Sequence, residues 1–235
     1  MKINTVKSDS ILCWICGAKA DTGEHMIKAS DLKSVFGHVS QHKPLYFNTS
    51  FKRNLPIKGL RSDHLKHSVL ICANCNNKIT QPYDLAWQKL SEYFRTKKPA
   101  LKNRDKVRLD SKFPWSTKQS MLDVHLFFIK QFGCLIVENK IPIDINTFSK
   151  AILNRKAHPK VFLSFTTRLV DNSRRLVGST PVYAALINNQ VMYATWFYIL
   201  DKIAVNIIYS EPTEKRIGLI RSWHPSRIDK KLYID

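Results

Sequence analysis

The chain has 235 residues with a hydrophobic content of 44%, which is enough to bury one sizeable core or two small ones and excludes a disordered protein. The chain has five cysteines, and this odd number argues against a disulfide framework. We see neither a secretory leader nor a run of about 18 apolar residues, and we therefore expect a cytoplasmic protein with no membrane partner. The 38 Lys and Arg residues outnumber the 18 Asp and Glu residues, and the formal charge of +20 exceeds what solubility requires and predicts a polyanionic partner.

Two Cys-x-x-Cys pairs dominate the N-terminal part of the chain. Cys13 pairs with Cys16, Cys72 pairs with Cys75, and Gly17 gives the backbone the freedom to turn around a metal ion. Each pair presents two sulfurs to one ion, so two pairs complete a tetrahedral zinc site. The alternative is four free buried thiols. The matching spacing favours a structural Zn²⁺ bound by all four cysteines.

The residues between and after these pairs predict two short strands, an insertion and a helix. Residues 11–27 contain the first metal-binding turn and then a strand that carries Glu24 and His25. Residues 31–67 are polar and rich in His and Lys, and we expect an insertion with local structure. Residues 69–71 form a brief apolar strand that leads into the second cysteine pair. From Asp84 the pattern is helical, since apolar residues recur in steps of three and four at Ala86, Trp87, Leu90, Tyr93 and Phe94.

The chain between Arg95 and Lys118 is strongly basic. It contains nine Lys and Arg residues but only two acidic residues, Asp105 and Asp110. Neutralising phosphates releases counterions and gives affinity that does not depend on sequence, so this segment predicts contact with nucleic acid. The alternative is a solvated linker that keeps the protein soluble. The predicted contact residues are Lys97, Lys98, Lys102, Arg104, Lys106 and Arg108.

The C-terminal half predicts helices packed on an antiparallel sheet. One helix covers the apolar residues from Met121 to Phe132, with Ser120 as its cap and Gly133 as its end, and a short helix covers residues 147–153. Apolar and polar residues alternate between faces in residues 161–169. Further strands separated by turn residues are predicted at 182–187, 191–200, 203–209 and 216–220. Residues 191–200 are apolar on both faces and should lie inside the sheet.

Together these elements predict the fold class α+β with two units. Residues 1–96 form the zinc-stabilised unit, residues 97–118 form a basic linker, and residues 119–235 form an α+β unit with an antiparallel sheet. The second unit carries no motif that assigns it a role. DNA contact, target choice and oligomerisation all stay open for it.

Three stretches of the first unit resemble the HNH endonucleases of the ββα-metal fold, in the branch with a two-knuckle zinc site. The stretches are Cys13-Trp14-Ile15-Cys16-Gly17, Gly23-Glu24-His25-Met26-Ile27 and Val69-Leu70-Ile71-Cys72-Ala73-Asn74-Cys75-Asn76-Asn77-Lys78. The resemblance covers roughly residues 11–95 and does not extend to the C-terminal unit. It implies that residues 1–96 are a zinc-bound HNH nuclease domain.

The resemblance also implies roles for individual residues. His25, which follows an acidic residue, takes the role of general base. Glu24 and Asn76 take the roles of ligands to a catalytic metal ion, and Asn77 is the alternative to Asn76 for this role. Glu24 stands where Asp is more usual in the family.

The middle position of the motif falls near His67 by its spacing from the second cysteine pair. The family usually has Asn there, and this residue props the catalytic loop. His64 and Ser68 are rivals for the position, because the insertion before them leaves the register open. Asp84 loosely matches an Asp that some relatives carry early in the closing helix.

The chemistry of phosphodiester hydrolysis needs these residue types. A neutral histidine with a pKa of about 6.5 accepts a proton from water at physiological pH, which suits His25. One ion on the oxygens of Glu24 and Asn76 would stabilise charge on the phosphate and on the leaving oxygen. Hard oxygen ligands favour Mg²⁺ or Mn²⁺ over zinc. The sequence therefore predicts an endonuclease that acts on DNA, with RNA not excluded. A homodimer is possible, since one such site cleaves one strand.

An alternative without catalysis uses the same residues. In a zinc-ribbon DNA-binding protein, Glu24 and His25 would be an exposed loop pair, and Asn76 would be a turn or helix-cap residue. The basic surface would then carry the whole function.

Overall fold

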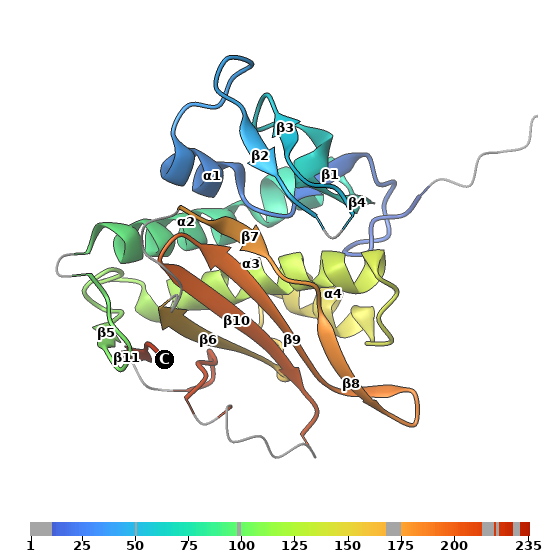
Figure 1. Cartoon of the computed structure of the whole chain (residues 1–235). Coiled ribbons are helices and arrows are strands. Elements are labelled where there is room, and N and C mark those ends of the chain that lie inside the picture. The colour runs from blue at the N-terminus through green and yellow to red at the C-terminus, as the bar shows by residue number, and fades with distance from the viewer. Residues whose placement is uncertain are drawn as a thin grey trace, which may run out of the picture.

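The computed structural model describes residues 11–49, 51–97, 100–167, 175–212, 219, 221–227 and 231–235 (Figure 1). Over this part the chain is an α+β protein with antiparallel sheets, as the sequence predicted. The strand predicted at residues 216–220 falls almost entirely outside the described residues, and Lys98 falls outside them as well.

The N-terminal part contains both predicted strands and the helix that follows them. Strand β1 (Thr22–His25) pairs antiparallel with β4 (Lys66–Ile71), and a register shift lies between Gly23 and His25. A short π-helical turn, η2 (Cys75–Ile79), leads into helix α2 (Gln81–Thr96). The predicted insertion has its own structure, which consists of helix α1 (Ala29–Phe36), the hairpin of β2 (Leu45–Phe47) and β3 (Leu55–Ile57), and the 3₁₀ turn η1 (Asp63–Leu65).

The C-terminal part is a five-stranded sheet covered by helices. Helices α3 (Thr117–Glu138) and α4 (Ile145–Leu153) lie with α2 against one face of the sheet (Figure 1). The strands are β6 (Val161–Thr167), β7 (Val177–Ser179), β8 (Tyr183–Ile187), β9 (Gln190–Leu200) and β10 (Ile203–Ser210). A separate pair joins β5 (Lys106–Arg108) to β11 (Lys231–Tyr233).

The sheet confirms two predictions from side-chain patterns. Buried and partly exposed residues alternate along β6, because successive side chains point to opposite faces. Strand β9 pairs with β10 along one edge and with β7 and β8 along the other, so it lies inside the sheet. Its apolar residues on both faces therefore correctly predicted its position.

Helix α3 is longer than the sequence predicted. It begins before Ser120 and runs through Gly133, so the prediction that these residues cap and end the helix is wrong. The side chain of Trp14 packs against the helix at Gly133, where an added Cβ would lie 2.3 Å from the ring. By length and composition α3 is apolar enough to span a membrane, but 83% of its apolar 18-residue stretch is buried inside the protein. It is the central helix of a globular fold.

One hydrophobic cluster runs through both predicted units. Trp87 of α2 stacks on Phe127 of α3, and their ring centroids are 5.6 Å apart. The basic segment predicted as a linker also contributes to this cluster, since Val107, Leu109 and Phe113 are buried. The boundaries between the two units stay a prediction.

Candidate functional site

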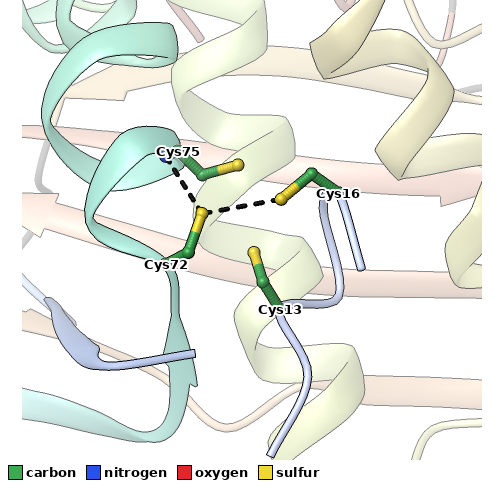
Figure 2. Close-up of side chains that lie close together, drawn as sticks. All are labelled: Cys13, Cys16, Cys72 and Cys75. Atoms are coloured by element: carbon green, nitrogen blue, oxygen red, sulfur yellow. Dashed lines mark hydrogen bonds between the residues drawn. The ribbon is translucent and has the colours of Figure 1, made fainter. Parts of the chain in front are cut away.

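The four cysteines come together in one cluster (Figure 2). Cys13 and Cys16 lie on the turn before β1, where Gly17 has a φ of 77° and donates its N–H to the Cys13 carbonyl. Cys72 directly follows β4, and the backbone N–H of Cys75 donates to its sulfur at 3.3 Å. The strand pair β1–β4 therefore brings the two cysteine turns together.

The sulfur geometry fits a tetrahedral metal ion. The four Sγ atoms lie within 4.8 Å of one another, and those of Cys16 and Cys72 are 3.5 Å apart. Zinc–sulfur bonds of about 2.3 Å place tetrahedral sulfurs about 3.8 Å apart, which matches this spacing. Three of the four cysteines are buried, as in a closed structural site. The cluster can hold a metal ion such as zinc.

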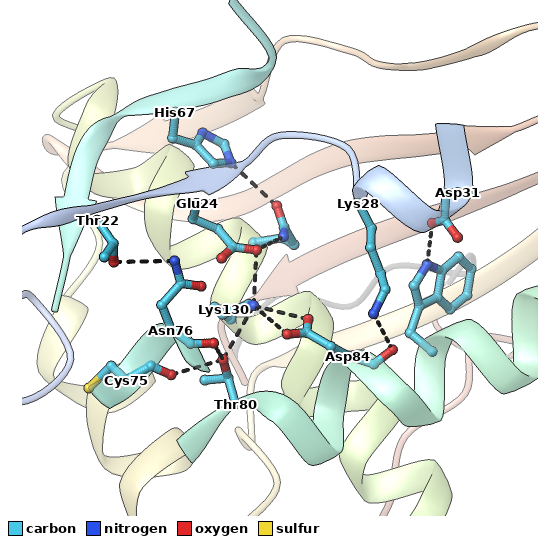
Figure 3. A network of polar contacts seen from close by, with 12 residues as sticks. Thr22, Glu24, Lys28, Asp31, His67, Cys75, Asn76, Thr80, Asp84 and Lys130 are labelled. Atoms are coloured by element: carbon cyan, nitrogen blue, oxygen red, sulfur yellow. Dashed lines mark hydrogen bonds and ion pairs between the residues drawn. The ribbon is translucent and has the colours of Figure 1, made fainter. Parts of the chain in front are cut away.

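Strand β1 turns Glu24 toward the interior of the protein. Only 7% of this residue is exposed. Its Oε1 atom accepts a hydrogen bond from Gln131 at 2.8 Å and lies 2.9 Å from the ammonium of Lys130. Both partners come from α3, so a carboxylate of the N-terminal strand is bound by the central helix of the C-terminal part (Figure 3).

Asn76 lies in η2, beside the cysteine cluster. Its side-chain Nδ2 donates to the Thr22 hydroxyl on β1 at 3.2 Å, and its backbone carbonyl accepts from Thr80 at 3.2 Å. The carboxamide points toward the carboxylate of Glu24 (Figure 3). Asn77 is exposed, whereas Asn76 is half-buried. The structure thus brings Asn76 and Glu24 together.

His25 lies beside Glu24 on β1 but outside this polar network. Its Nε2 is 2.9 Å from the carbonyl oxygen of Leu60, and the residue is half-buried. A carbonyl oxygen only accepts hydrogen bonds, so in the neutral ring Nε2 carries the hydrogen and Nδ1 keeps its lone pair. Among the described residues, no hydrogen bond joins His25 to Glu24 or Asn76.

His67 lies in β4 and is 3% exposed. Its Nδ1 is 2.9 Å from a carboxylate oxygen of Glu138, and its Nε2 is 3.3 Å from the side-chain oxygen of Gln131. Burial alone would raise the pKa of Glu138, but hydrogen bonds from His67 and Ser68 outweigh it and lower the pKa to about 2. The two rivals for the middle position, His64 and Ser68, are both exposed.

A buried lysine stands at the centre of the network, and the sequence reading missed it. Lys130 is fully buried, and its ammonium contacts Glu24, Asp84 at 3.0 Å and the Thr80 hydroxyl at 3.3 Å (Figure 3). Burial would lower the pKa of this ammonium, but the charges of Glu24 and Asp84 outweigh burial and raise it. The sequence signal for this site was the lysine itself, because a charge in a largely apolar stretch of helix requires a partner.

The described members of the basic set predicted to contact nucleic acid differ in their surroundings. Lys97 is half-buried over the Tyr93 ring, and Arg108 forms a two-point ion pair with Asp110. Lys102 is exposed. Arg104 and Lys106 are exposed as well, and both line a cavity next to β11.

Comparisons with protein-family models, with curated proteins and with solved structures gave no significant match to this chain. We therefore infer the function from the geometry of the chain itself.

Proposed function

We propose that this protein is a metal-dependent endonuclease of the HNH type that hydrolyses phosphodiester bonds in DNA. The observation that carries the proposal is the environment of His25 on β1. The Leu60 carbonyl fixes the proton on Nε2, so Nδ1 is the ring atom able to accept a proton from water. An imidazole oriented in this way, on the residue that follows Glu24, supplies the base that hydrolysis needs.

Glu24 and Asn76 are the residues that would hold the catalytic ion. Among the described residues, the second carboxylate oxygen of Glu24 has no hydrogen-bond partner, and the Asn76 amide donates through Nδ2 and leaves its oxygen for a metal. These hard oxygen donors fit Mg²⁺ or Mn²⁺. When bound, such an ion would stabilise negative charge on the phosphate. The cysteine cluster serves as a structural zinc site that fixes β1 against η2.

One observation favours a second candidate, a zinc-ribbon DNA-binding protein without catalysis. The Lys130 ammonium already forms ion pairs with Glu24 and Asp84, and its raised pKa keeps it charged. A divalent ion on Glu24 would lie close to this positive charge, and like charges at short range repel. In the second candidate, the Glu24 network only stabilises the fold.

Cleavage of plasmid DNA distinguishes the two candidates. The wild type is expected to nick the plasmid with Mg²⁺ or Mn²⁺, and His25→Ala should lower the rate by about 100-fold or more, as loss of a general base does. His42→Ala is the matched control, because His42 is an exposed histidine in the loop between α1 and β2. It should cut like the wild type.

Zinc content and melting temperature are measured for all three proteins, so that a loss of fold is not mistaken for a loss of catalysis. Equal cleavage by His25→Ala and the wild type would exclude His25 as the base. A wild type that binds DNA and cuts neither DNA nor RNA with either metal would favour the binding protein.

A further inference from the structure

A cavity lies at the edge of the five-stranded sheet, where two separate segments cover strand β6. Trp223 exchanges two backbone hydrogen bonds with Leu163, and the N–H of Asp235 donates to Phe165 at 2.8 Å. Because Leu163 and Phe165 are two residues apart, both segments meet the same edge of β6. Together with β5 they line a cavity of about 560 Å³. This volume is in the range of small-molecule binding pockets.

The cavity is strongly cationic. Among the described residues, ten line the cavity, and five of these carry a positive charge, whereas only Asp235 carries a side-chain negative charge. Asp235 is already engaged, because one of its side-chain oxygens accepts from Ser164 at 3.1 Å and the other lies 3.7 Å from Arg221. The positive residues are Arg104, Lys106, Arg221, Arg227 and Lys231. A negatively charged ligand would enter a field that this one carboxylate does not cancel.

Strand pairing and hydrogen bonds hold several of the lining residues in place. Lys106 and Tyr233 are direct partners in the β5–β11 pair, and the Lys106 ammonium lies 5.4 Å from the centre of the Tyr233 ring. The Arg227 guanidinium is held by the carbonyl oxygens of Ser222 and Leu219. Tyr233 is 37% exposed, so part of its ring faces the solvent. A site on paired strands is better preorganised than one on a free loop.

This cavity is distant from the Glu24 network. In sequence, strand β5 lies before α3, and Glu24 contacts α3 at Lys130, which is 13 residues after Thr117 at the start of the helix. At a rise of 1.5 Å per residue, this is about 20 Å along α3. Figure 1 accordingly shows β5 and β11 at one end of the molecule and β4 at the other. A ligand in the cavity would be bound apart from the proposed catalytic residues.

We infer that this cavity binds a nucleotide unit, with its phosphate between Arg104 and Arg221 and its base or sugar against Tyr233. Guanidinium groups pair with phosphate oxygens through two parallel hydrogen bonds, and an aromatic ring accepts any base by stacking. A nucleotide unit has two sources, a nucleic-acid strand and a free nucleotide. The inference needs no cleavage by the protein and goes beyond the proposed function.

Fluorescence anisotropy of a labelled oligothymidylate of about 12 nucleotides tests the site on the full chain without added divalent metal. The variant Arg104→Ala with Arg221→Ala should weaken binding about tenfold at moderate salt. The slope of the logarithm of affinity against the logarithm of salt concentration should become shallower by about 0.7, since both arginines contact the same phosphate and each phosphate contact on a single strand contributes about 0.7. The control pair, Lys150→Ala with Lys156→Ala, removes two exposed charges elsewhere and should change binding less than about twofold.

The result that overturns the inference is equal binding by the cavity variant and the control pair. No binding by the wild type would overturn it as well. Competition with thymidine monophosphate then identifies the source. Displacement by the mononucleotide assigns the site to free nucleotides, and displacement only by unlabelled oligonucleotide assigns it to a strand. His25→Ala should bind like the wild type, so a failure of the nuclease proposal is distinguishable from a failure of this site.

Discussion

Lys130 has the most demanding environment of any single residue in the candidate site. Its ammonium is fully buried, and three acceptors from two elements surround it: Glu24 on β1, Asp84 on α2 and Thr80 at the start of α2. An unpaired charge at this position would cost several kcal/mol, so the two carboxylates are required for α3 to pack here. The same contacts make Lys130 a competitor for any divalent ion that binds Glu24.

Replacing this lysine tests the competition. Lys130→Met keeps the length of the side chain but leaves Glu24 and Asp84 without their cation, which should destabilise the protein by about 3–5 kcal/mol. Added Mn²⁺ should restore part of this loss, because a divalent ion then neutralises the two carboxylates. The measurement is the melting temperature with and without Mn²⁺. The rise on adding Mn²⁺ should be larger in Lys130→Met than in the wild type.

Lys150→Met is the matched control, since Lys150 is an exposed lysine on α4. It should melt close to the wild type in both conditions. A Lys130→Met protein as stable as the wild type would show that the buried ion pairs contribute little.

At the scale of elements, the contact between Trp14 and Gly133 joins the first cysteine turn to α3. Glycine in the middle of a helix costs about 1 kcal/mol relative to alanine, so Gly133→Ala would be expected to stabilise an isolated helix. In this protein the added Cβ would meet three ring atoms of Trp14 between 2.3 and 2.9 Å away. We therefore expect net destabilisation of about 1–3 kcal/mol, because overpacking against a rigid ring outweighs helix propensity.

Urea unfolding measures this change. Gly59→Ala is the control, because an added Cβ there meets no atom within 4 Å. The double variant Gly133→Ala with Trp14→Leu should be less destabilised than the sum of the single variants, which is the coupling expected for residues in contact. If Gly133→Ala unfolded at a higher urea concentration than the wild type, helix propensity would be the larger effect.

The sequence correctly predicted the elements whose pattern depends on residues that are close together in the chain. Alternation along β6 and the apolar faces of β9 reflect neighbouring residues of the same strand, and both predictions are confirmed. The spacing of the cysteine pairs likewise predicted a cluster that can hold a metal ion. The errors and omissions concern contacts between distant residues. Gly133 lies inside its helix, where the Trp14 ring leaves no room for a Cβ, and Gln131 contacts Glu24 across 107 positions of sequence.

At the scale of the whole molecule, three buried histidines join helix α3 to the C-terminal segments. The Nε2 atom of His125 accepts from the backbone N–H of His158, and the His224 ring lies 3.0 Å from the His158 carbonyl oxygen. Burial lowers the pKa of all three, and the pKa of His158 falls to about 4. The charged neighbours of His158 are Lys160, Asp144 and Glu211. The fold therefore requires these rings to be neutral.

The protein should consequently lose stability as the pH falls below about 6.5, the pKa of an unfolded histidine. In that range the unfolded chain binds protons that the folded chain does not, so protonation favours unfolding. For His158 alone, a folded pKa of about 4 gives a loss of about 2 kcal/mol between about pH 7 and pH 5. The paired carboxylate of Glu138, with a pKa of about 2, contributes only below about pH 4.5. Urea unfolding across this range measures the slope, and His158→Gln should flatten it. A slope that is the same in the variant and the wild type would mean that His158 takes up its proton without unfolding.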